Sequence, residues 1–468
     1  MNQPRLDIYF IAIGGTGMAP LACLLQEQGH RVRGSDGPLY PPMSDLLAAA
    51  GIQPLPGFSP SHLEPRPDLV VVGNAVPRGN VEAQETERLG IPRVSMPEAL
   101  WRFFLSDRRP LVIAGTHGKT TTTSLAAWVY RSCGADPGYL IGGLPIDLPT
   151  SFASGSGPRF IVEGDEYNAS YFDRGPKFLH YRPQTLILTS IEYDHADLYP
   201  SPELLVDAYR RLISTLPSDG LLIACGDQPQ VLELAAGAPC EVMTYGLGKE
   251  CDLRPASFEL GATISCRLPD LSDGERAVTS PLAGAHNLSN MMAVWGAALR
   301  DGLEPARVAD ALSRFRGVHR RLEVVGEGPE GVVIDDFAHH PSAIAATLEA
   351  LRQRYPERRV LALFEPRSLS AGRRIFHYDY LRALSRADWV GIAPIYHRDR
   401  LSDDESLDLD LLCRELGTAG VESFHPAGIE ELYALARGAF RSGDVIVTMS
   451  SGSFGGIAKR LAESLTPG

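Results

Sequence analysis

The chain lacks several features that mark extracellular, nucleic-acid-binding and membrane-surface proteins. Seven cysteines are scattered over 468 residues without a C-x-x-C pair, so we expect reduced thiols and no disulfide scaffold or zinc ribbon. Positive charge is also scarce, because 44 lysines and arginines face 57 acidic residues, for a net charge of −13. This balance argues against nucleic acid as a partner. Any phosphate must therefore be met by local cations, backbone amides or metal.

A long unbroken apolar segment is missing as well. Residues 8–26 carry no charge and approach membrane-spanning length, but several glycines and Pro20 interrupt them. Asp7 leaves no clean basic start for a signal peptide. The sequence predicts a buried strand, a glycine turn and a helix here, and a cytoplasmic protein without a membrane partner.

Short apolar runs alternate with amphipathic segments along the chain, which predicts α/β domains with parallel sheets. The length exceeds that of one domain, and the polar break at 106–110 suggests a first boundary. An irregular stretch at 251–282 predicts a small antiparallel annex. The predicted domains are residues 1–108, 109–316 and 317–468. Continuously apolar, buried strands are predicted, among others, at Leu69–Val72, Leu111–Ala114, Phe160–Glu163, Thr185–Thr189, Val360–Phe364 and Trp389–Ile392.

The strongest chemical signal is a glycine-containing loop between a predicted strand and a predicted helix. Backbone N–H groups at a helix N-terminus bind phosphate, a lysine reaches the terminal phosphates, and the hydroxyl after it binds Mg²⁺. The standard spacing is incomplete, since Ile113 stands where the first glycine is expected. The segment nevertheless predicts a phosphate-binding loop. Its residues are Gly115, Thr116, His117, Gly118, Lys119, Thr120 and Thr121.

Acidic residues and a histidine follow the next two predicted strands. Glu163 opens the run E-G-D-E-Y, and His195 closes the run E-Y-D-H. Carboxylates at the carboxyl end of a parallel strand suit Mg²⁺, which prefers oxygen ligands. A solvated acidic turn and a structural histidine are the alternatives. Together with the loop, these residues outline a metal–nucleotide site.

Later segments carry groups suited to the rest of a nucleotide. Asn287 is either the N-cap of a helix or, with Asn290 one turn later, an adenine-reading amide. Arg320 and Arg321 are either a surface pair or phosphate-binding cations. Asp336 ends a predicted strand, where an acidic residue commonly binds ribose; an acidic N-cap is the alternative.

The N-terminal glycine run follows the first predicted strand. Gly14, Gly15, Thr16 and Gly17 lack complete dinucleotide-binding spacing, because Pro20 holds its last position. Asp36 near the end of the second strand adds a dinucleotide-like feature.

Taken together, the motifs resemble those of the Mur ligases, the ATP-dependent amide-forming enzymes of peptidoglycan assembly, over nearly the whole chain. The resemblance implies a Rossmann-like N-terminal domain, a P-loop-type ATPase α/β domain and a Rossmann-like C-terminal domain that closes on ATP and peptide. It rests on GDEY at Gly164–Tyr167, HYRP at His180–Pro183, EYDHAD at Glu192–Asp197, DDFAHHP at Asp335–Pro341, FEPRS at Phe364–Ser368 and SGSFGGI at Ser451–Ile457.

The resemblance also implies roles for individual residues. Gly14–Gly17 and Asp36 belong to the UDP-sugar domain. The positions that match family sites are Lys119 for phosphate, Thr120 and Glu163 for Mg²⁺, His195 for a second metal, Asn287 and Asn290 for adenine, Arg321 for phosphate, Asp336 for ribose and His339 beside it. We predict Lys119, Glu163, His195, Arg321 and His339 as catalytic.

Two positions depart from the family pattern. Tyr209 stands where several relatives have a lysine that is carbamylated to bridge two metals, and Phe337 replaces a common tyrosine. Another group must fill the bridging role, and a hydroxyl contact at 337 is in doubt.

The expected reaction joins UDP-N-acetylmuramate to the tripeptide L-alanyl-γ-D-glutamyl-meso-diaminopimelate through an acyl phosphate, with ATP and Mg²⁺. Arg367, just beyond a predicted strand, is expected to bind a peptide carboxylate, although exposed arginines are the alternative. Two other functions remain open. One is the same chemistry with L-alanine as acceptor, and the other is a nucleotide-regulated UDP-sugar binding protein.

Overall fold

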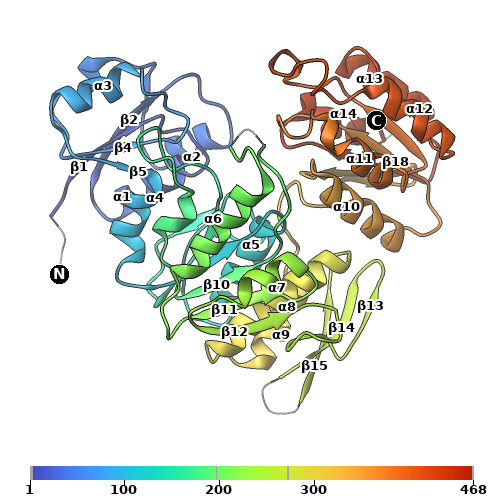
Figure 1. Cartoon of the computed structure of the whole chain (residues 1–468), viewed down its shortest axis with the longest axis horizontal. Coiled ribbons are helices and arrows are strands. Elements are labelled where there is room, and N and C mark those ends of the chain that lie inside the picture. Colours follow the sequence, from blue (N-terminus) through green and yellow to red (C-terminus); the bar gives the residue numbers. More distant parts are fainter. Residues whose placement is uncertain (1–3, 197, 271–273, 466–468) are drawn as a thin grey trace. The chain divides into compact units, whose positions relative to one another are not determined.

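The computed structural model describes residues 4–196, 198–270 and 274–465, so Asp197 of the EYDHAD run lies outside the described residues (Figure 1). The described residues form two compact units. The first comprises the chain up to Ile191 with Glu203–Leu253 and Ala293–Glu304, and the second comprises Glu192–Pro202, Arg254–Met292 and the chain from Pro305. The three domain boundaries stay a prediction.

The N-terminal sheet of the first unit is parallel, in the order β3-β2-β1-β4-β5. Its strands are β1 (Asp7–Ile11), β2 (Arg31–Asp36), β3 (Leu55–Pro56), β4 (Leu69–Val72) and β5 (Arg93–Ser95), with helices α1 (Met18–Glu27), α2 (Met43–Ala49), α3 (Val81–Arg88) and α4 (Met96–Leu100). The uncharged N-terminal segment is therefore a strand, a turn and a helix, as predicted. The strand ends at Ile11, because Ala12 takes a left-handed φ of 64°.

The second sheet of this unit has the order β12-β11-β10-β6-β9-β7-β8 and is parallel except at β8. Its strands are β6 (Arg109–Ala114), β7 (Gly138–Leu140), β8 (Phe152–Ala153), β9 (Arg159–Gly164), β10 (Thr185–Leu188), β11 (Leu221–Cys225) and β12 (Glu241–Tyr245), with helices α5 (Lys119–Ser132), α6 (Pro202–Ser214) and α7 (Pro229–Ala235). Ala114 pairs with Gly164 on one side and with Leu188 on the other. The carboxyl ends of β6, β9 and β10 therefore meet at one edge.

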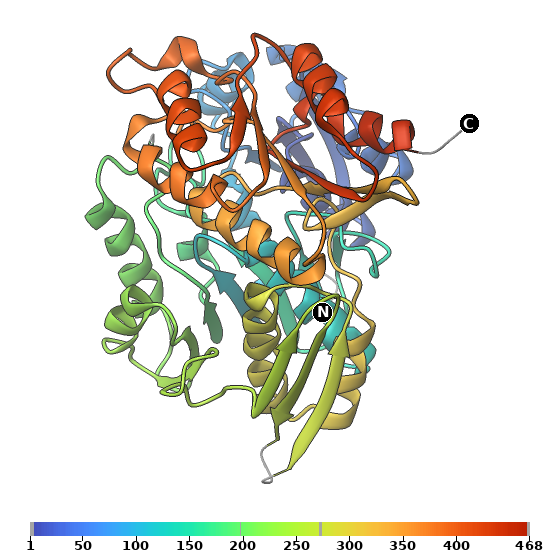
Figure 2. The same ribbon diagram turned by 90° about the vertical axis from the view of Figure 1, so that its right-hand side faces the viewer.

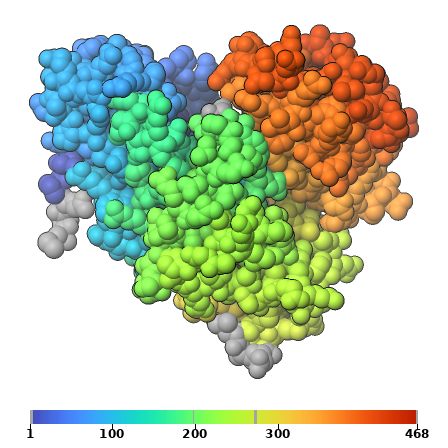
Figure 3. Space-filling view, viewed as in Figure 1, coloured from blue at the N-terminus to red at the C-terminus, as the bar shows by residue number. Residues whose placement is uncertain are grey.

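Side chains between β9 and β10 contact residues in and after helices α3 and α4 of this unit. The Arg182 guanidinium lies 4.4 Å from the centroid of the Trp101 ring, which follows α4. Tyr171 Oη donates to Glu87 on α3 at 3.0 Å. In the space-filling view, the blue and green parts of this unit adjoin each other (Figure 3).

The second unit contains the antiparallel annex that the sequence predicts. Strands β13 (Ser257–Leu260), β14 (Ile264–Pro269) and β15 (Glu275–Ser280) pair antiparallel and lie side by side in Figure 2. Helix α9 (Pro305–Arg314) packs against β15, and α8 (Ala285–Arg300) follows the annex along the chain.

The C-terminal sheet has the order β16-β17-β21-β18-β19-β20 and is parallel except at β16. Its strands are β16 (Glu323–Gly328), β17 (Gly331–Asp336), β18 (Val360–Phe364), β19 (Trp389–Ile392), β20 (Glu422–Phe424) and β21 (Asp444–Met449). Successive side chains of the central strands point to opposite faces of the sheet. On one face, Val332 and Ile334 pack under α10 (Pro341–Arg354), α11 (His377–Leu384) and α12 (Leu409–Thr418). Val333 faces α13 (Ile429–Ala439) and α14 (Ile457–Leu465).

The predicted fold class is confirmed. Each large sheet is mostly parallel and is flanked by helices, which explains why its strands read as continuous apolar runs in the sequence. Among the helices of the described residues, none has both the length and the apolar character of a membrane span.

Candidate functional site

The glycine-containing loop follows β6 and ends at helix α5. Gly115 and Gly118 both take a positive φ, of 132° and 80°. A Cβ atom at Gly115 would lie 2.1 Å from Thr189 Oγ1, so only glycine lets the loop pack this closely against the end of β10. The amide of Thr116 donates to Ser190 O at 2.8 Å, and that of His117 donates to Ser190 Oγ at 3.0 Å. The loop is therefore fixed by the neighbouring strand.

Lys119 is the first residue of α5, and its side chain folds back over the loop. Its ammonium donates to Gly115 O at 2.6 Å and lies 3.1 Å and 3.2 Å from the two carboxylate oxygens of Glu166. Burial opposes the lysine's charge, but Glu166 and the carboxylates beside it outweigh burial and raise the pKa of Lys119. Lys119 is therefore held as a cation inside the loop.

Glu163 is the second-last residue of strand β9 and lies beside the start of α5. Its carboxylate accepts from Gly142 N at 2.6 Å and from Thr120 Oγ1 at 3.1 Å. Burial, and then the charge of Asp165, raise the pKa of Glu163 to about 7. A buried carboxylate in contact with a hydroxyl, both oxygen donors, fits a Mg²⁺ ion, which would also stabilise the ionised carboxylate.

In the second unit, Asp194 stands between two of the predicted histidines. Its Oδ2 lies 3.8 Å from His195 Nε2 and 3.7 Å from His339 Nε2. Burial disfavours the carboxylate, but His339, together with His195, outweighs it and holds the pKa of Asp194 well below its usual range. His195 takes a left-handed φ of 55°, and its amide donates to Asp194 Oδ1 at 2.7 Å. The structure thus brings His195 and His339 to one carboxylate.

The two adjacent arginines have different surroundings. Arg320 lies 3.2 Å from Asp335 and donates to Ser450 O at 2.7 Å, so it connects the end of β17 with the loop after β21. The Arg321 guanidinium lies over the ring of Phe337, 4.5 Å from its centroid. Arg320 is therefore held by contacts within the fold. The alternative that both arginines are a simple surface pair does not describe it.

Asp336 is buried at the end of β17, with 5% of its surface exposed. Its carboxylate accepts from Leu322 N and Ala338 N, each at 2.7 Å, and from Thr347 Oγ1 at 3.2 Å. Burial raises the pKa of Asp336, and the charge of Arg321 opposes that rise. The carboxylate therefore fixes the backbone just after Arg321 and just after Phe337, and its contact with ribose stays a prediction.

Asn287 and Asn290 lie in the first turns of α8. Asn287 is not the N-cap, because the helix begins at Ala285 and the Asn287 amide group donates back to Ala283 O at 2.8 Å. Asn290 Nδ2 donates to Asn287 Oδ1 at 3.3 Å. Both side chains are buried and share one face of the helix, as the adenine hypothesis requires.

The N-terminal glycine run leads into α1. Asp36 at the end of β2 accepts from Gly14 N and Gly37 N, each at 2.7 Å. A Cβ atom at Gly14 would lie 2.0 Å from Leu39 Cδ2, so the loop is close-packed there. Gly15, Thr16 and Gly17 complete the turn, and Gly17 is the residue before the helix. The run and Asp36 therefore form one local structure.

Arg367 follows β18 at the carboxyl edge of the C-terminal sheet. Its guanidinium lies 4.0 Å from the centroid of the Tyr396 ring and 3.5 Å from Glu365. A Cβ atom at Gly452 would lie 2.0 Å from Arg367 Nε, so the glycine run after β21 leaves room for this side chain. The Tyr396 ring and Glu365 hold Arg367, and Gly452 leaves space for it. The arginine thus lies at the edge where α/β domains bind ligands.

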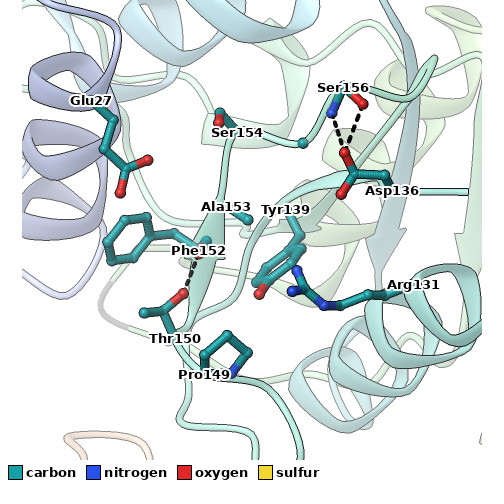
Figure 4. Close-up of a pocket in the computed structure, with 11 residues that line it drawn as sticks. Glu27, Arg131, Asp136, Tyr139, Pro149, Thr150, Phe152, Ala153, Ser154 and Ser156 are labelled. Atoms are coloured by element: carbon teal, nitrogen blue, oxygen red, sulfur yellow. Dashed lines mark hydrogen bonds between the residues drawn. The ribbon is translucent and has the colours of Figure 1, made fainter. Parts of the chain in front are cut away.

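A hollow of about 450 Å³ lies in the first unit, away from these residues (Figure 4). It is lined by Glu27, Arg131 and Tyr139, among others, and none of the predicted site residues lines it. Asp136 accepts from Ser156 N and Oγ there, at 2.8 Å and 2.7 Å.

Sequence reasoning missed several residues that shape the site. Glu166 pairs with Lys119, Asp194 lies between the histidines, and Ser190 binds the loop amides. Each of the two acids stands in a quoted run, GDEY or EYDH, so their presence was visible. Nothing in the sequence says which carboxylate of such a run meets which cation.

Three family models match consecutive parts of the chain. They are "Mur ligase family, catalytic domain" over residues 7–108, "Mur ligase middle domain" over residues 113–298, and "Mur ligase, glutamate ligase domain" over residues 320–452.

Individual relatives match over nearly the full length. The chain is 37% identical over 465 residues, 98% of both chains, to the UDP-N-acetylmuramate–L-alanyl-γ-D-glutamyl-meso-2,6-diaminoheptandioate ligase of Escherichia coli. It is 33% identical over 467 residues to the UDP-N-acetylmuramate–L-alanine ligase of Rubrobacter xylanophilus, covering 98% of this chain and 100% of that protein. A crystal structure of a murein peptide ligase from Psychrobacter arcticus superposes with a TM-score of 0.72 and 30% identity, over 98% of both chains.

The middle-domain model, over residues 113–298, covers the glycine-containing loop, Lys119 and Glu163. The chain belongs to the Mur ligase family and is an ATP-dependent amide ligase.

Proposed function

We propose that this ligase joins the lactyl carboxylate of UDP-N-acetylmuramate to the α-amine of L-alanyl-γ-D-glutamyl-meso-diaminopimelate. The carboxylate attacks the γ-phosphate of ATP and gives an acyl phosphate and ADP. The amine then attacks the acyl carbon, forms the amide bond and releases phosphate. Because ATP and UDP-linked sugars are cytoplasmic metabolites, we place the reaction in the cytoplasm.

The observation that carries the proposal is that buried Glu163 and partly buried Lys119 and Thr120 lie together at the carboxyl edge of three parallel strands. Lys119 would bind phosphate oxygens, and Thr120 with Glu163 would hold Mg²⁺. When bound, Mg²⁺ neutralises phosphate charge. Ser190 holds the loop and Gly115 O holds Lys119 before the reaction. Groups that are already in place stabilise the charge that develops during phosphoryl transfer.

The remaining predicted residues receive the other parts of the substrates. We propose that Gly14–Gly17 and Asp36 serve the UDP-sugar, and that Arg367 binds a carboxylate of the peptide. For the nucleotide we propose Arg321 at the phosphates, Asp336 at the ribose, and Asn287 with Asn290 at the adenine. His195 and His339, held by Asp194, are proposed for a second metal and for the reacting groups.

The acceptor distinguishes this function from its rivals. Phosphate release from ATP is measured with UDP-N-acetylmuramate and, in separate samples, the tripeptide, L-alanine or no acceptor. We expect release to require an acceptor and the tripeptide to have the higher kcat/KM. Preference for L-alanine would support the second candidate, which the 33% identical relative favours. Nucleotide and sugar binding without phosphate release would identify a binding protein.

A further inference from the structure

The ion pair between Lys119 and Glu166 joins the predicted phosphate-binding lysine to a residue with no assigned role. Lys119 begins α5, and Glu166 lies in the turn after β9. Both side chains are withdrawn from solvent, with exposed fractions of 13% and 2%. The carboxylate meets the ammonium with both oxygens, at 3.1 Å and 3.2 Å.

The contacts of Lys119 account for all of its hydrogens. An ammonium group has three N–H donors. Here they are directed at Gly115 O at 2.6 Å and at the two oxygens of Glu166, with Thr116 O farther away at 3.4 Å. A phosphate oxygen that binds Lys119 must therefore replace one of these acceptors. The carbonyls belong to a loop fixed by β10, so the side chain of Glu166 is the acceptor that can be exchanged.

We propose that Glu166 is a positioning residue. Its carboxylate binds the Lys119 ammonium where a nucleotide phosphate would otherwise bind, so ATP must displace this carboxylate. This inference rests on the proposed function, because it takes Lys119 as the lysine that binds the terminal phosphates. Glu166 keeps the ammonium charged and aimed into the loop, and it lowers ATP affinity as a consequence. After displacement, the buried negative charge of Glu166 also remains close to the phosphates.

Asp165 supplies the matched control. It stands next to Glu166 and carries the same charge, but it pairs with Lys177 at 3.3 Å and is one-third exposed. Asp165→Asn therefore removes one negative charge from the same turn without releasing Lys119. A general charge effect predicts similar gains from Asp165→Asn and Glu166→Gln, whereas displacement predicts a gain from Glu166→Gln alone.

The test is the dissociation constant of ATP, and of AMP as a ligand without terminal phosphates, measured by calorimetry on nucleotide-free protein at fixed Mg²⁺. Glu166→Gln should bind ATP about tenfold more tightly, equivalent to about 1.4 kcal/mol, with AMP affinity unchanged. Asp165→Asn should change ATP affinity by less than about threefold, since Asp165 is one-third exposed and partly screened, and Lys119 keeps its pairing with Glu166. In a Lys119→Met background, Glu166→Gln should give no gain.

A second variant covers the case in which Glu166→Gln does not fold. Glu166→Asp keeps the charge but cannot keep both contacts, so ATP affinity should rise by a few-fold. Unchanged or weaker ATP binding in the Glu166 variants would overturn the inference, as would an equal gain with AMP or a gain that persists in Lys119→Met. If the wild-type protein does not bind ATP, the proposed function fails together with this inference.

Discussion

The guanidinium of Arg321 lies over the ring of Phe337, 4.5 Å from its centroid. The resemblance found in the sequence implies a tyrosine at this position, and the sequence alone leaves the role of phenylalanine open. Phenylalanine and tyrosine have the same ring face, and the structure shows that this face meets the Arg321 cation. Asp336 fixes the backbone beside Arg321 through Leu322 N. Ring and carboxylate together therefore orient the predicted phosphate-binding arginine.

Phe337→Leu should weaken the enzyme, whereas Phe337→Tyr should not. A cation–π contact contributes about 0.5–2 kcal/mol, so its loss should lower kcat/KM for ATP by roughly 2- to 30-fold. Phe337→Tyr keeps the aromatic face and should stay within about twofold of the wild type. Steady-state kinetics with ATP varied measures both. Equal activity in Phe337→Leu would show that the ring does not position Arg321.

The raised pKa of Glu163 predicts that the metal-free protein loses stability as pH rises. An unfolded glutamate titrates near 4.5 and the folded one at about 7, so the folded state binds the extra proton between these values. The stabilisation is fully present below pH 4.5 and is lost as pH passes 7, for a total on the order of 3 kcal/mol.

Urea unfolding in EDTA, between about pH 5 and pH 8, measures this loss. Glu163→Gln cannot titrate and should flatten that part of the profile. Mg²⁺ needs the ionised carboxylate, so its affinity should rise with pH and level off above about 7. If wild type and Glu163→Gln show the same pH dependence, Glu163 is not the group that titrates.

Arg367→Ala should weaken binding of the tripeptide and spare the other substrates. Loss of a charged hydrogen bond costs about 1.5–3 kcal/mol, which is roughly ten- to hundredfold in KM if KM follows affinity. KM values for ATP and UDP-N-acetylmuramate should barely move. Arg382→Ala is the control, because Arg382 is exposed on α11 and pairs with Asp379. Similar losses for all three substrates would remove the peptide-binding role from Arg367.

We predict that the activity does not depend on dissolved CO₂, because Tyr209 stands where several relatives are expected to have a carbamylated lysine. This residue is fully buried in α6, with its ring 5.4 Å from that of Phe178, and it has no amine to carbamylate. Enzyme prepared and assayed in CO₂-stripped buffer should have the same kcat as enzyme given bicarbonate. Activation by bicarbonate would mean that a lysine elsewhere is carbamylated.

The large sheets could be predicted from the sequence because their strands are buried on both faces. Leu69–Val72, Val360–Phe364 and Trp389–Ile392 begin and end as predicted, since each is a short apolar run that follows a charged residue. The edge strand β16 (Glu323–Gly328) was not predicted. Its residues are only partly buried and include glycines, so no apolar run marks it.

The site could be predicted as a set of residues but not as a set of contacts. The loop and its lysine follow from local spacing. Glu163, Asp165 and Glu166 are three carboxylates within four residues, yet Glu163 meets Thr120, Asp165 meets Lys177 and Glu166 meets Lys119. Strand register and the turn after β9 decide this assignment, and neither is visible in residue types.

The most direct test of the whole account follows an oxygen atom. UDP-N-acetylmuramate labelled with ¹⁸O in its lactyl carboxylate is incubated with ATP, Mg²⁺ and a mixture of tripeptide and L-alanine, and the products are analysed by mass spectrometry. An acyl phosphate predicts one ¹⁸O in each released phosphate, with ADP as the nucleotide product and the tripeptide adduct as the main amide. Label in AMP, unlabelled phosphate, or an adduct with L-alanine alone would contradict the account.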